Sequence, residues 1–122
     1  HKEFPPITRH RLALYCGASG DHNPIHVDID FAKAAGFPDV FAHGMLVMGY
    51  LGQALTDAVA PSRIRSFSTR FAAITQLGAQ LTCEGMVTEL IEQGGEQRAK
   101  LALTTKDQHG EIKLAGEAII AL

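Results

Sequence analysis

The stretch GMLVMGYLGQALTDAV, residues 44–59, decides how this sequence folds. Its large apolar side chains point in nearly every direction around a helix, and a helix that is apolar all round belongs in the protein interior. These side chains are Met45, Leu46, Val47, Met48, Tyr50, Leu51 and Leu55. Three glycines in the same stretch lower its helix propensity and favour close approach by other backbone or by a ligand. The sequence therefore predicts one central buried helix that the rest of the chain surrounds.

After this stretch the apolar period changes from that of a helix to that of a strand. Apolar and polar residues alternate through four segments that are separated by turn residues, among them Gly94-Gly95 and residues 109–111. The predicted strands cover residues 63–71, 76–93, 97–108 and 112–122, with Gly78 and Gly85 as bends or bulges. A short strand at residues 2–4 would make five. The expected fold class is α+β, with a curved antiparallel sheet wrapped around the central helix.

Two shorter helices are expected before the central one. Thr8 is a suitable N-cap for a helix that ends at Gly20, and Asp28 is a suitable cap for a short helix that Gly36 ends. Loops are expected between the helices, because Pro24 disfavours helical backbone at the residue before it. The helices therefore occupy the first half of the chain and the strands the second.

The loop between these helices carries the sequence SGDHNPIH, residues 19–26, which gathers titratable side chains into one short run. Loops collect Asp, Asn and Pro for reasons of turn geometry alone. Taken singly, Asp21 is most often a turn or capping residue and His26 a structural or surface histidine. A functional interpretation therefore needs the whole motif.

The whole motif resembles the signature of the MaoC-like hydratases and dehydratases, the hydratase-2 or (R)-specific enoyl-CoA hydratase group. That signature is Gly-Asp, one free position, Asn-Pro, an aliphatic residue and His, and residues 20–26 match it without a gap. The resemblance extends over almost the whole chain, through ITRHRLALYCGASGD, AKAAGFPDVFAHGMLVMGYL and RFAAITQLGAQLTCEG. It implies the hot-dog fold, which agrees with a sheet wrapped around one helix. Members of the family usually pair into dimers or fuse two copies.

The resemblance implies that Asp21 and His26 are the catalytic pair. Hydration of a 2-enoyl thioester needs a water activated to attack Cβ and a proton delivered to Cα, and a carboxylate and an imidazole that touch one water supply both. We expect His26 to take the larger share of water deprotonation, because its ordinary pKa of about 6.5 suits neutral pH. Asp21 would hold the water and pass a proton toward Cα, although the residue types alone do not divide the two roles. In the family the product is the (3R)-hydroxyacyl thioester.

Gly44 is the expected oxyanion donor, because unpaired amides at the start of a helix favour a developing negative charge. The resemblance implies the same role for this glycine. Asn23 and Pro24 are expected to organise the loop rather than to take part in the chemistry. His43 could cap the central helix, line the pocket or contact the substrate. The candidates for the substrate pocket are Phe41, His43, Met45 and Met48, with core packing as the competing interpretation for the apolar ones.

Composition excludes several classes of function. The formal net charge is −2 and no Lys/Arg cluster is present, so neither nucleic acid nor a membrane surface is an expected partner. Cys16 and Cys83 lack metal or redox spacing, and we expect two reduced packing residues in a cytoplasmic protein. Asp21, His22, His26 and His43 are plausible ligand types, but they form no known zinc pattern, so no metal is expected. One domain over residues 1–122 is the simplest organisation.

The sequence is thus interpreted as a hydro-lyase that interconverts trans-2-enoyl and (3R)-3-hydroxyacyl thioesters. The thioester is expected to be that of coenzyme A or of acyl carrier protein, and no cofactor is needed beyond coenzyme A as part of the substrate. A homodimer is expected, because five strands around one helix leave an edge and a face to cover. Two alternatives stay open: a thioesterase on the same fold, and a non-catalytic acyl-thioester-binding subunit of a heteromer.

Overall fold

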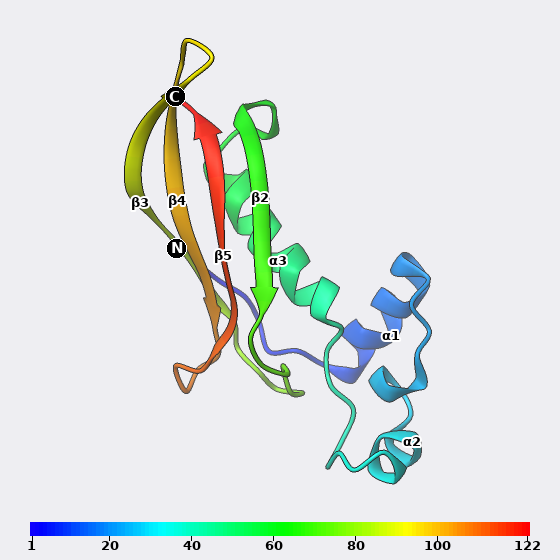
Figure 1. Ribbon diagram of the computed structural model, residues 1–122. Helices are drawn as coiled ribbons and strands as arrows, with labels where there is room; N and C mark the ends of the chain where they lie inside the picture. The colour runs from blue at the N-terminus through cyan, green and yellow to red at the C-terminus, as the bar shows by residue number, and fades with distance from the viewer.

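The computed structural model describes residues 1–122, which form a five-stranded antiparallel sheet with a long helix across one of its faces (Figure 1). The strands are β1 (Lys2–Glu3), β2 (Ile64–Phe71), β3 (Thr82–Gln93), β4 (Glu96–Lys106) and β5 (Ile112–Ala121). The long helix is α3 (Gly44–Ala58), and it follows α1 (Arg9–Ser19) and α2 (Ile29–Ala34). Single 3-10 turns cover Pro24–His26 and Pro61–Arg63. The predicted α+β class, strand number and central helix are confirmed.

The sheet has the order β1-β3-β4-β5-β2, so the strands at its two edges come from distant parts of the chain. β3 and β4 form a hairpin whose turn is Gly94-Gly95, with φ of 60° and 78°. These positive φ values explain why glycine occupies both positions. β2, which directly follows α3, returns to pair with β5 at the far edge. The sheet packs one of its faces against α3, which is the hot-dog arrangement (Figure 1).

The core lies between α3 and alternate residues of β4 and β5. Leu51 and Leu55 of α3 are 1% and 5% exposed, and they belong to the same buried cluster as Leu101, Leu103 and Leu114 of the sheet. The period of two along each strand puts these leucines on the face that α3 covers. Burial of this one face of α3 holds the two layers together.

The expectation that α3 is enclosed on every side is wrong for this chain. Met45 is 57% exposed, and Gly49 has no atom within 4 Å of where a Cβ would stand. The sheet covers only one side of the helix, and the opposite side exposes Gln53 and Thr56 as well as Met45 and Gly49. A Cβ at Gly44 or Gly52 would meet only a side chain, that of Phe71 at 2.9 Å or of Phe67 at 3.7 Å. The glycines therefore do not mark a helix packed closely against other backbone.

β3 begins at Thr82 rather than at residue 76, and its irregularity lies elsewhere than expected. Gly78 has φ of 81° and donates its N–H to the Ile7 carbonyl, so it belongs to a turn that precedes the strand. Gly85 pairs in register with Leu103, and the shift in register falls between Val87 and Glu89. Alternation of apolar residues continues through such a turn, which is why the sequence pattern overran the strand.

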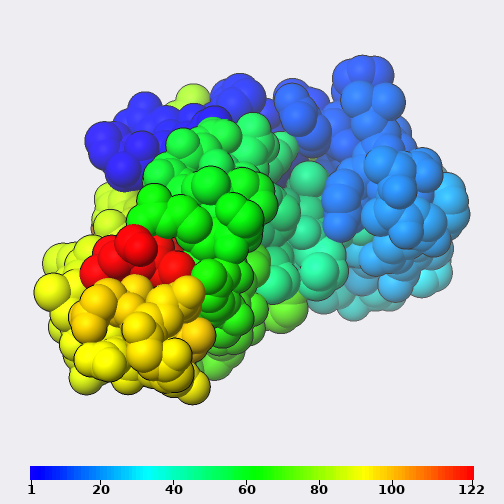
Figure 2. All heavy atoms as spheres, turned by 90° about the horizontal axis from the view of Figure 1, so that it is seen from above, coloured from blue at the N-terminus to red at the C-terminus, as the bar shows by residue number.

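α1 and α2 stand beyond the end of the sheet, beside the start of α3 (Figures 1 and 2). Their caps are those that the sequence predicts: the Thr8 side chain accepts from the Arg11 amide, and Gly20 ends α1 with φ of 78°. Asp28 accepts from the first amides of α2. Arg9 and Asp39 form a two-pronged ion pair, at 2.9 and 2.6 Å, which ties α1 to the segment that leads into α3. The loop between α1 and α2 is thereby held against the beginning of the central helix.

None of the helices combines the length and the apolar character needed to cross a bilayer. Both cysteines are free and buried, as predicted, with Cys16 in α1 and Cys83 in β3.

Candidate active site

The loop from Ser19 to His26 is built from short hydrogen bonds between its own polar side chains and the backbone. The Asp21 amide donates to Ser19 Oγ at 3.1 Å, and the Asn23 amide donates to Asp21 Oδ1 at 3.2 Å. Asn23 Oδ1 in turn accepts from the Ile25 amide at 3.1 Å, at the start of the 3-10 turn that Pro24 opens. Asn23 and Pro24 thus organise this loop, which reverses the chain and carries Asp21 and His26 to the same place.

His26 is held by the segment that leads into α3. Its side chain is largely buried, and its Nδ1–H donates to the Phe41 carbonyl at 2.7 Å. The carbonyl can only accept, so the hydrogen bond fixes the proton of the neutral ring on Nδ1. The other nitrogen, Nε2, has no protein partner and is not sealed from solvent. His26 therefore offers an acceptor lone pair at Nε2.

Three side chains converge at this point. One carboxylate oxygen of Asp21 and one ring nitrogen each of His26 and His43 all lie within 4.8 Å of one another. A hydrogen bond to water is about 2.8 Å long, so one water can touch two groups at this separation. Asp21 is exposed, whereas both histidines are buried, so the site opens to solvent on the side where Asp21 lies.

His43 is the most buried member of the group, with 1% of its surface exposed. Its Nε2–H donates to the Asp21 backbone carbonyl at 3.2 Å, and its ring stacks on that of His26 with centroids 3.8 Å apart. Its Nδ1 is buried without a partner. Burial lowers the pKa of His43, and the neighbouring His26 lowers it further. His43 is therefore a neutral imidazole near pH 7.

The same three residues offer donor types that metal ions use, but their arrangement suits a water better. The planes of the stacked rings of His26 and His43 are only 24° apart. The lone pair of an imidazole lies in its ring plane, so two stacked rings direct their lone pairs side by side rather than toward one ion. Moreover, Nδ1 of His26 and Nε2 of His43 already serve backbone carbonyls.

Gly44 opens α3 immediately beside this group. The first amide of α3 that donates a hydrogen bond is that of Leu46, to the His43 carbonyl, so the Gly44 amide is left unpaired. A Cβ at position 44 would stand 2.9 Å from the ring of Phe71. A cavity of about 320 Å³ lies here, lined by Gly44, Phe41 and Phe71 among others. The free amide of Gly44 therefore lies between the group of Asp21 and His26 and this apolar cavity, which neither Asp21 nor His26 lines.

The chain matches the MaoC like domain over residues 2–109. It belongs to the MaoC-like dehydratase family. A relative in Rhodospirillum rubrum, an (R)-specific enoyl-CoA hydratase, is 32% identical over 116 residues, which is 93% of this chain and 78% of the relative. The enoyl-CoA hydratase ChsH3 of Mycobacterium tuberculosis is 38% identical over 80 residues, 63% of this chain. This chain covers only 28% of the length of that mycobacterial relative.

Solved structures agree with this assignment of the fold. The R-hydratase PhaJ1 from Pseudomonas aeruginosa, in its unliganded form, superposes with a TM-score of 0.84 at 30% identity. The match covers 98% of this chain and 78% of the other. The hot-dog fold that the sequence predicts is therefore shown by its helices, its sheet order and its structural relatives.

The remaining pocket candidates of this MaoC-like domain are divided by the structure. Phe41 lines the cavity beside Gly44, and Met48 is half-buried against the core. Met45 is exposed, and neither it nor His43 lines the cavity beside Gly44. His43 forms no side-chain cap on α3. Its neighbours are instead the residues of the loop and of α1.

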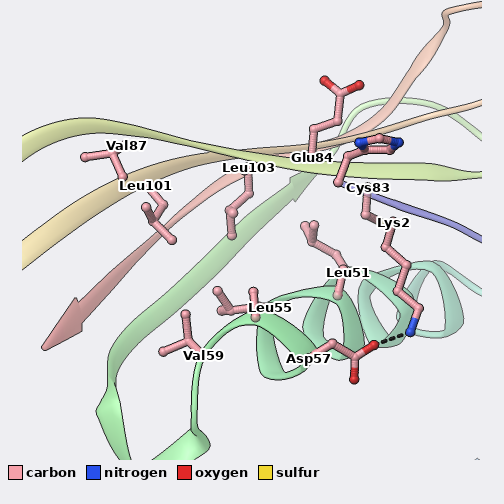
Figure 3. Close-up of a pocket in the computed structure, with 14 residues that line it drawn as sticks. Lys2, Leu51, Leu55, Asp57, Val59, Cys83, Glu84, Val87, Leu101 and Leu103 are labelled. Atoms are coloured by element: carbon pink, nitrogen blue, oxygen red, sulfur yellow. Dashed lines mark hydrogen bonds and ion pairs between the residues drawn. The ribbon is translucent and has the colours of Figure 1, made fainter. Parts of the chain in front are cut away.

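A second and larger cavity, of about 510 Å³, lies between α3 and strands β3 and β4 (Figure 3). Leu51 and Leu55 of α3 point into it toward Leu101 and Leu103 of β4. An ion pair between Lys2 and Asp57 lies at its side. It shares no lining residue with the cavity beside Gly44.

Sequence reasoning missed two neighbours of the site. Cys16 lies 3.5 Å from Nε2 of His43, and Phe71 covers Gly44. Cys16 shares the face of α1 that carries Leu12, which indicated burial but not a neighbour. No local pattern marks Phe71, because it reaches Gly44 from the far end of β2.

Proposed function

We propose that this protein reversibly hydrates trans-2-enoyl thioesters to (3R)-3-hydroxyacyl thioesters. The observation that carries the proposal is the convergence of Asp21 and His26 beside the unpaired amide of Gly44. Membership of the MaoC-like family and the named activities of its relatives support it. The acceptor lone pair at Nε2 of His26 is what a water-activating base requires.

In the proposed reaction, His26 accepts a proton from water through Nε2 while the water oxygen bonds to Cβ of the enoyl group. The electron pair of the double bond moves toward the thioester oxygen and forms an enolate. The Gly44 amide donates to this oxygen, and the helix terminus stabilises its charge. The proton that His26 took from water then passes by way of Asp21 to Cα, which returns His26 to its neutral form and completes the addition of one water. The hydroxyl and the hydrogen arrive from one water position, and therefore on the same face.

We propose coenzyme A or acyl carrier protein as the carrier of the acyl group. The reaction adds water without oxidation or reduction, so it needs no redox cofactor, and coenzyme A would enter only as part of the substrate. We also propose a cytoplasmic protein, because a reducing compartment keeps two buried thiols such as Cys16 and Cys83 free.

A homodimer is proposed on the evidence of the β3 edge. β1 pairs only with Thr82 and Cys83, so the rest of β3 presents an unpaired backbone edge. Val87 and Leu90 lie opposite the buried Leu101 and Ala99, yet they are 57% and 69% exposed. A second copy of the chain, related by a twofold axis, could extend the sheet at this edge and cover both side chains.

Crotonyl-CoA tests the proposed reaction. Purified protein should remove the enoyl absorbance without releasing thiol, and chiral analysis should identify the (3R) product. Release of thiol would indicate a thioesterase instead. Binding without either change would indicate a non-catalytic acyl-thioester-binding subunit.

Substitutions in the loop test the assignment of the pair. Asp21→Asn and His26→Ala should each lower kcat by about 10²- to 10⁴-fold, because each removes a proton-transfer group. His22→Ala is the matched control, because His22 lies between them in the same loop and is exposed. Its kcat should stay near that of the unsubstituted protein, and all three variants should keep the same circular dichroism spectrum. Near-normal rates in both Asp21→Asn and His26→Ala would refute the pair.

A further inference from the structure

His43 is held from four sides although it is almost fully buried and lines neither the cavity beside Gly44 nor that between α3 and the sheet. Tyr15 meets its ring edge-on with centroids 4.7 Å apart, and Cys16 Sγ lies 3.5 Å from Nε2. On the other side are the Asp21 carbonyl and the stacked ring of His26. The titratable side chains that contact His43 are thus those of Tyr15, Cys16 and His26. His43 therefore joins α1 to both members of the proposed catalytic pair.

We propose that His43 is a positioning residue, whose Nε2–H fixes the backbone of Asp21 while its ring supports the imidazole of His26. The inference rests on the proposed function and deepens it. The single N–H of His43 is used by the Asp21 carbonyl, so it is not available to a water, and His43 does not line the cavity beside Gly44. Its role is to set the positions of the Asp21 carboxylate and the His26 imidazole.

An imidazole at this position needs an explanation that packing does not supply. A phenyl ring would fill the same space and stack on His26 without leaving a buried nitrogen unpaired, as Nδ1 of His43 is left. Buried polar atoms without partners are rare in folded proteins. What a phenyl ring lacks is the N–H that reaches the Asp21 carbonyl. The donor is therefore the feature that accounts for histidine here.

The neutral state of His43 also suits a neighbour that must accept a proton. The lone N–H serves Asp21, so a second proton on Nδ1 would lie buried without an acceptor and against the ring of His26. Burial already lowers the pKa of His43. A neutral ring at this distance leaves His26 free to become positively charged when it deprotonates water.

Two substitutions separate the donor from the ring. His43→Phe keeps a ring to stack on His26 and removes the N–H, whereas His43→Gln keeps an N–H near the position of Nε2 and removes the ring. We expect His43→Phe to lower kcat for crotonyl-CoA by about tenfold or more, with KM within about twofold, because small displacements of reacting groups are costly. His43→Gln should recover most of the lost kcat even where its Tm is the lower of the two.

Leu81→Ala is the control for damage to the core, because Leu81 is buried and is not part of the site. It should lower Tm while kcat below that temperature stays unchanged. If His43→Phe keeps full kcat, the positioning role is wrong. If His43→Phe and His43→Gln lose kcat in proportion to their loss of Tm, His43 is a packing residue and the proposal also fails.

A spectroscopic readout distinguishes this inference from the proposed function. Nitrogen NMR of the histidine side chains should show His43 as the neutral Nε2–H form. This form should persist as the pH is lowered from 8 to below 6.5, the ordinary pKa of histidine, because the pKa of His43 is lowered. A proton on Nδ1 would overturn the positioning role even in an active enzyme. An unsubstituted protein that binds crotonyl-CoA but does not hydrate it would overturn the proposed function, and the positioning role with it.

Discussion

The Gly44 position shows how a missing side chain can matter for chemistry. A methyl group there would meet the Phe71 ring at 2.9 Å, on the helix terminus whose amide we propose as the oxyanion donor. The Phe71 ring is 53% exposed and free to turn aside, so the fold should tolerate the change. Substrate binding should be impaired, because the methyl group and the displaced Phe71 ring would crowd the thioester.

We therefore expect Gly44→Ala to lower kcat/KM for crotonyl-CoA by about 10- to 100-fold with little change in Tm. Gly49→Ala is the matched control, since it lies on the same helix and its new Cβ meets nothing within 4 Å. It should keep its activity and raise the free energy of unfolding by about 0.5–1 kcal/mol. Equal activity in the two variants would remove Gly44 from the proposed mechanism.

At the scale of the elements, one carboxylate joins two strands that are not neighbours in the sheet. Glu96, at the start of β4, accepts two hydrogen bonds from Arg65 of β2 at 2.9 Å each and one from Arg98 at 2.7 Å. β5 lies between β4 and β2 in the strand order. Arg65, followed by Arg98, lowers the pKa of Glu96 from 4.5 to about 2. The Glu96 side chain is 35% exposed, so solvent screening makes its contribution to stability modest.

This lowered pKa predicts a window of acid sensitivity. Because the folded pKa lies below the ordinary value, the stabilisation is present above pH 4.5 and is lost as the pH falls toward about 2. Glu96→Gln should be less stable than the unsubstituted protein at neutral pH, and the two should converge toward pH 2. Urea unfolding followed by circular dichroism across this range measures the difference.

Glu117→Gln serves as the control for that comparison, because Glu117 and Lys100 are 3.4 Å apart and make a looser, exposed pair. It should change the pH profile less than Glu96→Gln does. A constant difference between Glu96→Gln and the unsubstituted protein from pH 7 to 2 would contradict the assigned ion pair.

The same strands show why an element can be recognised while its limits are not. The alternation of apolar residues identifies β3 and β4, because the pleat places every second side chain on the core. It does not show that residues 76–81, predicted as the start of this strand, precede β3, since a turn at Gly78 preserves the alternation. Likewise the apolar residues of α3 predict a helix in the core, but not that the sheet covers only one of its sides.

For the whole molecule, the unpaired edge of β3 is the feature with the clearest consequence. Leu90 is 69% exposed on the side of the sheet that faces the core elsewhere. We expect Leu90→Lys to convert the proposed dimer into a monomer, because burying a leucine contributes about 1.5–3 kcal/mol in each copy and a lysine would not be buried. Size-exclusion chromatography with light scattering measures the mass directly.

Leu14→Lys is the control, because Leu14 is 58% exposed on α1, away from the β3 edge. It should leave the dimer intact. A monomeric unsubstituted protein, or dimers of equal strength in both variants, would refute an interface at β3.

The sequence by itself determined the fold class, the helix caps, the hairpin turn at Gly94-Gly95 and the loop that joins Asp21 to His26. The caps, the turn and the loop depend on interactions between residues close in sequence, and the fold class follows from the period of the apolar residues. A cap binds the amides of the next helical turn, and a proline restricts the backbone of the residue before it. Only the tertiary structure decided that His43 stacks on His26 and anchors Asp21, that Phe71 covers Gly44, and that one side of α3 stays open. Those contacts join residues distant in sequence, and chain folding, rather than any local pattern, brings them within a few ångströms.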